Sequence, residues 1–189
     1  YSIGEIQFPT KSGLASMLVN KDKILDIIQK IKEDEKLLYD QLIDITVVDN
    51  ISSKTNYSSQ RFTVIYSFLS LRFNKRLLIL SNISEEDLSI DSITQIFESA
   101  NWFEREVYDL FGITFRNHPN LQRLMNDYNF QGHPLRKDFP LTGYEEVRYD
   151  ENSKKVVYEP VTLKQEFRDF DNESPWEGMK ETIKKEIGK

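Results

Sequence analysis

The sequence predicts an α+β fold: a compact domain with a mainly antiparallel sheet packed by helices, followed by an extended C-terminal arm. The strongest strand patterns, residues 60–73 and 76–83, are separated by a short link, Asn74-Lys75, which is typical of an antiparallel hairpin. Two stretches with apolar residues at helical spacing predict the packing helices. The C-terminal part loses this periodicity and carries scattered aromatic residues, as segments that lie across another surface do.

These patterns divide the chain into three parts. Residues 1–20 are an N-terminal extension without a readable pattern, residues 21–128 are the compact α+β domain, and residues 129–189 are the extended arm, expected to wrap partner subunits. A chain of 189 residues is long enough to bury roughly 70% of its unfolded surface without disulfide bonds.

The first elements follow from local composition. Asn20 or Asp22 is a suitable N-cap for a helix that runs to about Leu38, because the apolar residues after it form one stripe. Residues 42–48 are rich in β-branched side chains and predict a strand. The polar residues 49–59 predict a loop before the central hairpin.

A second helix is expected to begin at Asp91 or Ser92 and to end at Gly112. One face is apolar, and it consists of Ile93, Ile96, Phe97, Ala100, Phe103, Val107, Tyr108 and Phe111. The opposite face carries Trp102, Arg105, Glu106 and Asp109. A tryptophan on the polar side is unusual, because large aromatic residues belong in cores and interface anchors.

Glu104 lies in the middle of the apolar face of this helix, where a lone ionised carboxylate is costly. One interpretation is general acid–base chemistry with a raised pKa. The favoured interpretation is a buried ion pair with an arginine, for which Arg72, Arg123 and Arg136 are the candidates.

The later elements are shorter. Pro119 suits the first turn of a short helix over residues 121–127. Residues 145–149 and 155–158 predict one more hairpin across residues 150–153.

Composition excludes several classes of function. The chain has no cysteine, so disulfides, thiolate metal sites, cysteine-ligated iron–sulfur clusters and thiol nucleophiles are excluded. A net charge of −6 does not offer the cationic face that nucleic acid binding needs. No apolar run approaches the roughly 20 residues of a membrane-spanning helix. Phosphate-binding loops and the GxSxG nucleophile motif are absent as well.

Both histidines lie in a segment dense in charge, and each precedes a proline: His118-Pro119 and His133-Pro134. Glu106, Asp109 and Asp138 nearby could complete a metal site, but no pair of ligands has the i, i+4 spacing of a helical zinc motif. We therefore favour the interpretation that each imidazole caps a turn or forms a hydrogen bond with a main-chain carbonyl.

The run Arg136-Lys137-Asp138, between Leu135 and Phe139, suits either an anion site or a docking strip with apolar anchors on both sides. Docking is favoured because arginine and aromatic residues dominate desolvated contacts between proteins and the chain is acidic overall.

Several runs of residues resemble one family. They are Glu104-Arg105-Glu106-x-x-Asp109-x-x-Gly112, Phe115-x-x-His118-Pro119-x-Leu121, and Gly132-His133-Pro134-Leu135-Arg136-Lys137-Asp138-Phe139-Pro140-Leu141. The chain is thereby similar to the 30 kDa subunit (the C-type subunit of bacteria) of respiratory complex I, NADH:ubiquinone oxidoreductase. Glu159-Pro160, Glu166-Phe167-Arg168-x-Phe170 and Ser174-Pro175-Trp176-Glu177 look like the C-terminal extension of that family. One departure is Gln122, which stands where members are often basic.

The resemblance implies an α+β structural subunit of the peripheral arm that supports the quinone-reducing module. It implies that this chain binds no cofactor itself, while the assembled complex uses FMN, iron–sulfur clusters, NADH and ubiquinone. The expected partners are the 49 kDa quinone-site subunit and the subunit with the terminal iron–sulfur cluster. The expected location is the matrix side of the mitochondrial inner membrane or, alternatively, the cytoplasmic face of a bacterial plasma membrane.

Two sets of residues are predicted on this basis, with no catalytic, cofactor or metal residue among them. The predicted partner-facing residues are Trp102, Arg105, Asp109, Arg136, Asp138, Phe139, Phe167 and Trp176. The residues of the structural motif are Glu104, Glu106, His118, Arg123, His133 and Lys137. The alternatives are a related subunit of a membrane-bound hydrogenase and a free-standing hydrolase that uses His118 and His133.

Overall fold

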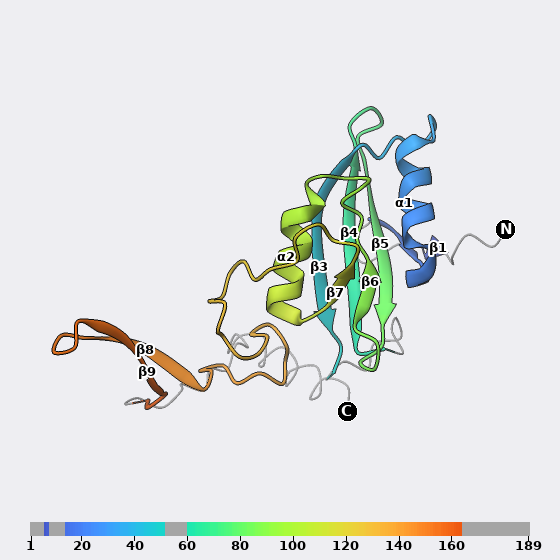
Figure 1. Cartoon of the computed structure of the whole chain (residues 1–189). Coiled ribbons are helices and arrows are strands. Elements are labelled where there is room, and N and C mark those ends of the chain that lie inside the picture. The colour runs from blue at the N-terminus through green and yellow to red at the C-terminus, as the bar shows by residue number, and fades with distance from the viewer. Residues whose placement is uncertain (1–5, 8–13, 52–59, 164–189) are drawn as a thin grey trace, which may run out of the picture. The chain divides into compact units, whose positions relative to one another are not determined.

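The computed structural model describes residues 6–7, 14–51 and 60–163, and it divides the chain into two compact units at the Gly143–Tyr144 bond. Each unit is described by itself. The elements of the first unit (Figure 1) are β1 (Ile6–Gln7), β2 (Ala15–Leu18), a 3₁₀ turn η1 (Lys21–Lys23), α1 (Ile24–Glu33), β3 (Gln41–Asp49), β4 (Phe62–Ser70), β5 (Lys75–Ile83), β6 (Ser89–Asp91), α2 (Ala100–Phe111) and β7 (Thr114–Arg116).

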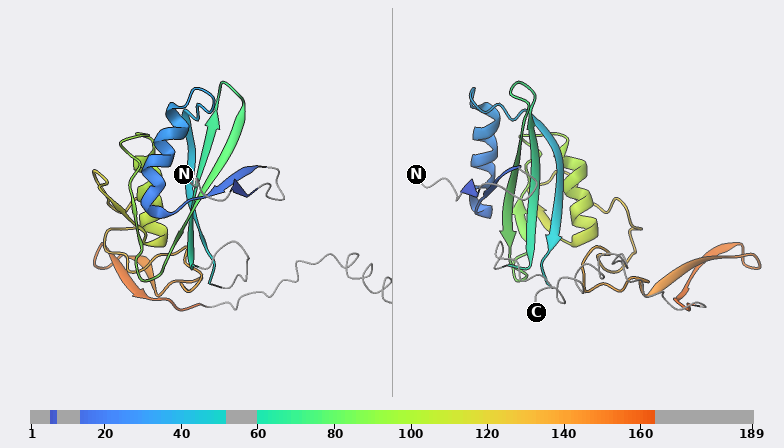
Figure 2. Two further views of the ribbon diagram at one scale, coloured as in Figure 1. Left: turned by 90° about the vertical axis from the view of Figure 1, so that its right-hand side faces the viewer. Right: turned by 180° about the vertical axis from the view of Figure 1, so that it is seen from behind.

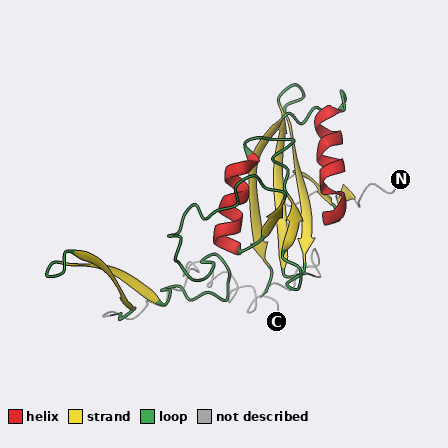
Figure 3. Cartoon of the chain, in the orientation of Figure 1, coloured by secondary structure: helices red, strands yellow, loops and turns green. Residues whose placement is uncertain are grey.

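A five-stranded sheet in the order β1-β2-β5-β4-β3 forms the centre of this unit (Figure 3). The β2–β5 pair is parallel and the other three pairs are antiparallel. A separate parallel pair, β6–β7, flanks α2 in sequence. The predicted α+β fold with a mainly antiparallel sheet is therefore confirmed.

Both helices lie on the same face of the sheet (Figure 2). Because side chains alternate along a strand, every second residue of β4 points to that face, and Phe62, Val64, Tyr66 and Phe68 are fully buried there. The Lys32 ammonium of α1 donates to a carbonyl of the segment before α2 and lies 4.6 Å from the Phe97 ring centroid there. One shared core thus holds both helices and the sheet together.

The central hairpin forms as predicted, with a longer turn. β4 ends at Ser70 and β5 begins at Lys75, so the turn spans residues 71–74 and not the Asn74-Lys75 link alone. Asn74 has a φ of 48°, a left-handed conformation that asparagine tolerates better than most residues.

The first helix ends earlier than predicted. The Asn20 side chain accepts a hydrogen bond from the Asp22 N–H and caps the 3₁₀ turn, as expected for an N-cap. α1 stops at Glu33, because Asp34 is extended and Leu38, with φ 41°, reverses the chain. The Tyr39 N–H then returns to the Ile31 carbonyl, 3.0 Å away, so the helix cannot reach Leu38.

The second helix starts later than predicted, at Ala100 and not at Asp91 or Ser92. Asp91 ends strand β6, and the Ile93 N–H donates to the Glu104 carboxylate, so residues 92–99 form turns. The predicted stop is confirmed: Gly112 has a φ of 75° and its N–H bonds the Tyr108 carbonyl. In the described part of the chain, neither helix is long and apolar enough to cross a membrane.

The second unit contains the predicted second hairpin, β8 (Glu145–Asp150) and β9 (Lys155–Pro160). The arm was predicted to begin at residue 129, whereas the first unit continues to Gly143. The reason is a set of long-range contacts made by residues 133–137 with α2 and β3, which no local pattern reveals. The predicted wrapping of partners by the arm stays a prediction.

Candidate partner-binding site

Asp109 lies at the centre of a carboxylate-binding loop formed by its own chain. Its side chain is 0% exposed, and one oxygen accepts the N–H groups of Leu124, Met125 and Asn126 at 2.6–2.9 Å. The other oxygen accepts the Arg123 guanidinium at 2.6 Å. Burial alone would raise the pKa of this carboxyl, but the hydrogen bonds from Asn126, Leu124 and Arg123 outweigh it and hold the pKa well below its ordinary value.

This loop corrects two predictions. Residues 121–127 do not form a helix, because three consecutive N–H groups converge on one carboxylate oxygen of α2. Asp109 does not face a partner either, since it is buried and both of its oxygens are occupied within the chain.

The residues after the loop cap the C-terminal end of α2, whose last carbonyls have no partner within the helix. The His133 ring bonds the Asp109 carbonyl through Nδ1 at 2.9 Å, and Arg136 Nε donates to the Phe111 carbonyl at 2.6 Å. A Cβ on Gly112 would lie 2.5 Å from both the His133 ring and the Arg136 guanidinium, so only glycine fits beneath them.

A second ionic cluster ties the same segment to the sheet. Asp49, at the end of β3, is almost fully buried and accepts hydrogen bonds from Arg61 and from the Lys137 N–H. Arg61 also forms ion pairs with Glu85 and, at 2.7 Å, with Asp138. Burial opposes ionisation of Asp49, but the hydrogen bonds from Arg61 and Lys137 lower its pKa below the ordinary value.

Glu104 occupies a different environment. It is 0% exposed and accepts hydrogen bonds from the Ser92 hydroxyl at 2.6 Å and from the Ile93 N–H at 2.7 Å. Among the described residues no arginine or lysine pairs with it, so the predicted ion pair with an arginine is wrong. Burial raises the pKa of Glu104 to about 7, against the opposing effect of these two hydrogen bonds.

His118 lies beside Glu104, with Nε2 3.9 Å from a carboxylate oxygen. Its Nδ1 accepts the Asn120 N–H, which places the proton on Nε2, and Nε2 then donates to the Asn101 carbonyl at 3.1 Å. Burial lowers the pKa of this imidazole and favours the neutral ring. Both histidines therefore bond main-chain groups, as the structural interpretation predicts.

No metal centre is visible where the chain is described: residues 14–51 and 60–163 contain no group of three histidine or acidic side chains arranged to hold an ion. The cysteine-free composition gives no thiolate to an iron–sulfur cluster either.

The remaining predicted residues have mixed exposure. Trp102 is 60% exposed, and the Arg105 guanidinium lies 5.1 Å from its ring centroid while donating to the Gln122 and Arg123 carbonyls. Glu106 is half-buried, and Lys137 is exposed. Phe139 is half-buried against the Phe130 ring. Phe167 and Trp176 lie outside the described residues.

The β8–β9 hairpin presents a surface that sequence reasoning missed. Val147 pairs with Tyr158 and Tyr149 pairs with Val156, so these four side chains share one face. Each of them is 56–58% exposed. The other face is polar, with Arg148 paired to Glu159 at 3.0 Å. The alternation of residues 147–149 with 156–158 could have shown this apolar face from the sequence.

Comparisons with known proteins agree on one group of relatives. Residues 17–145 match the family model described as "Respiratory-chain NADH dehydrogenase, 30 Kd subunit". Proteins named as the C subunit of NADH-quinone oxidoreductase are similar over most of the chain. The one from Rhodospirillum rubrum is 47% identical over 89% of this chain and 76% of its own length, and the one from Ruegeria pomeroyi is 50% identical over 88% and 80%.

Two solved structures are similar as well. One, titled "Nqo5 of the trypsin-resistant fragment (1-134) in P63 form", is 30% identical with a TM-score of 0.52 and covers 58% of this chain and 83% of its own. The other, from the membrane-bound sulfane sulfur reductase, an archaeal respiratory membrane complex, is 21% identical with a TM-score of 0.61. It covers 82% of this chain and 92% of its own, and shares the fold.

Proposed function

We propose, from the premise that this chain belongs to the 30 kDa subunit family of the respiratory-chain NADH dehydrogenase, that it is a structural subunit of the peripheral arm of complex I. In this role it holds the quinone-reducing module in place and contributes no catalytic residue of its own. Electron transfer to a quinone depends on the relative positions of donor and acceptor, so a chain without chemistry can be necessary for activity.

The apolar face of the β8–β9 hairpin carries this proposal. A two-stranded hairpin is marginally stable alone in water and needs packing on its apolar face. Val147, Tyr149, Val156 and Tyr158 are each more than half exposed. Clustered exposed apolar side chains with a polar rim are typical of protein interfaces. The hairpin thus has the composition of an element that is completed by another subunit.

The ionic groups of the first unit also support a structural role. Asp49, Asp109, Arg123 and Arg136 are engaged within the chain, so the ionic groups that could have formed a catalytic centre build the fold. We propose that FMN, the iron–sulfur clusters, NADH and ubiquinone are bound by other subunits of the complex.

The proposed partners are the 49 kDa quinone-site subunit and the subunit that carries the terminal iron–sulfur cluster. We place the chain on the matrix side of the mitochondrial inner membrane, with the cytoplasmic face of a bacterial plasma membrane as the alternative that the bacterial relatives support. Cross-linking mass spectrometry of the complex purified from the source organism identifies both the neighbours and the membrane.

The hairpin offers a matched pair of substitutions to test the proposal. Val156 lies on the apolar face, and its neighbour Val157 lies on the polar face opposite Arg148. Val156→Asp is expected to lower the amount of assembled complex on a native gel about tenfold, which corresponds to about 1.4 kcal/mol of binding free energy. Val157→Asp is the control and is expected to assemble normally.

Quinone reduction is measured in the same samples and divided by the amount of assembled complex. The structural role predicts that turnover per assembled complex stays close to that of the wild type in both variants. Normal assembly of the Val156→Asp variant, or intact assembly with collapsed turnover, would contradict the proposal and would point to direct chemistry.

A further inference from the structure

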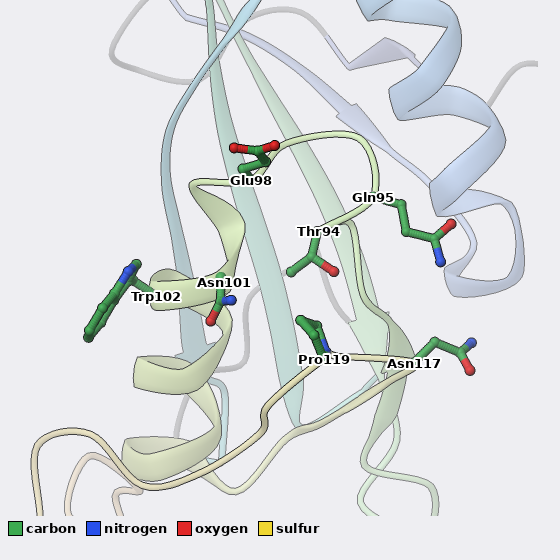
Figure 4. A pocket seen from close by; sticks show the side chains of 7 residues that line it. All are labelled: Thr94, Gln95, Glu98, Asn101, Trp102, Asn117 and Pro119. Carbon is green, nitrogen blue, oxygen red and sulfur yellow. The ribbon is translucent and has the colours of Figure 1, made fainter.

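A groove of about 540 Å³ lies on the first unit, between the turns before α2 and the turn after β7 (Figure 4). Thr94, Asn101 and Pro119 lie together in the middle of it, and Glu98 and Trp102 lie on the side of α2. The residues that line it belong to neither of the ionic clusters around Asp109 and Asp49, so the groove is a separate feature of the surface.

The walls of this groove are fixed from beneath by buried hydrogen bonds. Ser92 bonds Glu104 on one side and the Thr94 hydroxyl, at 2.8 Å, on the other. His118 joins the opposite wall to α2 through the Asn101 carbonyl. Because the Glu104 and His118 side chains are 0% exposed, water does not compete for these bonds. The groove is therefore pre-organised, which lowers the entropic cost of binding a partner.

Trp102 is a rigid aromatic anchor at the rim. The Arg105 guanidinium lies over its ring, and two hydrogen bonds to main-chain carbonyls fix that guanidinium. The indole is nevertheless 60% exposed, the exposure expected of a residue whose contact surface lies on another molecule. Tryptophan is among the residues that dominate binding energy at interfaces.

The charge and polarity of the lining indicate the occupant. The lining contains one carboxylate, Glu98, and no lysine or arginine. The amides of Asn101 and Asn117 can pair with the N–H and C=O groups of an extended peptide. The Glu98 carboxylate favours a cationic side chain through ion pairing, while Arg105 of this chain already lies over the Trp102 ring.

We propose that this groove binds an extended segment of a neighbouring subunit, with a lysine or arginine of that segment paired with the Glu98 carboxylate and an adjacent part of the segment packed on the exposed Trp102 indole. The inference rests on the proposed function, because it takes the occupant from the same complex. It adds a second contact, independent of the β8–β9 hairpin, and specifies the chemistry of the residue that is recognised.

Site-specific photo-cross-linking tests the proposal in the assembled complex. A benzophenone amino acid replaces Trp102 in the full chain, and cross-linked peptides are mapped by mass spectrometry. The groove predicts one main product, a peptide of another subunit with a lysine or arginine beside the cross-linked residue. The same probe at Glu35, an exposed site in the turn after α1, is the control and is expected not to give that product.

Charge reversal provides a second, independent measurement. Glu98→Lys is expected to lower the amount of assembled complex about fivefold, and reversal of the mapped basic residue is expected to restore it. Glu35→Lys, which alters net charge equally, is expected to change assembly less than about twofold.

The outcomes distinguish a failure of the groove proposal from a failure of the proposed subunit role. If the chain assembles normally but position 102 gives no cross-link, or a cross-link to a peptide without a basic residue, the proposed occupant of the groove is wrong. The proposed role as a subunit is then unaffected. Normal assembly of Glu98→Lys also overturns the groove proposal. A chain that never co-purifies with other subunits of the complex overturns both.

Discussion

The two units of this chain use their unusual residues in opposite ways. In the first unit, acidic and basic groups that look like an active site in the sequence are buried and bonded to one another, as Asp109 is to Arg123 and to three main-chain N–H groups. In the second unit, ordinary valines and tyrosines stay exposed on one face of a hairpin. The ions thus build the fold, and the binding surface that we propose for the second unit is apolar.

The largest expected effect comes from removal of the central carboxylate of the first unit. Asp109→Ala removes the carboxylate that pairs with Arg123 and accepts three N–H groups, and we expect it to lower the free energy of unfolding by about 3–5 kcal/mol. Urea denaturation of the purified chain measures this loss. Asp44→Ala, at an exposed site on β3, is the control, with an expected change within about 0.5 kcal/mol.

A loss below about 1 kcal/mol for Asp109→Ala would show that residues 121–139 hold together without the carboxylate. The claim that buried ionic groups stabilise the first unit would then be wrong.

The next prediction concerns Glu104, whose pKa of about 7 lies above the ordinary value of 4.5. An acid with a raised pKa in the folded state binds its proton more tightly there, so its contribution is fully present below pH 4.5 and is lost as the pH rises through 7. The stabilising contribution of Glu104 that is lost between pH 4.5 and pH 7 is roughly 3 kcal/mol. Glu104→Gln has no proton to lose and should become more stable relative to the wild type over this range.

Unfolding free energies of both proteins at pH 5, 6, 7 and 8 give the difference directly, and titration of His118 and His133 contributes to both curves. A difference that does not grow with pH would mean that Glu104 is ionised in the fold throughout, and that an unrecognised cation compensates it.

The smallest expected effect on stability comes from a substitution on the apolar face of the β8–β9 hairpin. Val156→Asp places a charge on an exposed face, so the free energy of unfolding of the isolated chain should change by less than about 0.5 kcal/mol. The same substitution is expected to reduce assembly strongly. Loss of stability comparable to that of Asp109→Ala would mean that the hairpin face packs within the chain and is not reserved for a partner.

Elements governed by local chemistry were predicted well. Both hairpins, the Asn20 cap and the Gly112 stop follow from residues within a few positions of one another. Elements governed by distant partners were not. The second helix does not start at Asp91 because the Ile93 N–H bonds the Glu104 carboxylate. The short helix expected over residues 121–127 does not form because N–H groups of that segment bond the Asp109 carboxylate.

The same distinction applies to the site residues. The density of charge between residues 104 and 138 indicated an unusual segment, but no local spacing shows that Arg136 caps the Phe111 carbonyl or that the Lys137 N–H reaches Asp49. Trp102, by contrast, was singled out by its place on the polar side of an amphipathic helix, and it is exposed.

Limited digestion with trypsin tests the division of labour between the two units most directly. The purified full chain, alone and within the assembled complex, is digested and the cuts are mapped by mass spectrometry. We predict that the isolated chain is cut within the second unit, at Arg148, Lys154 or Lys155, while the first unit survives, and that assembly protects these sites. A hairpin that resists trypsin equally well alone, or that is cut equally fast within the complex, would contradict this division.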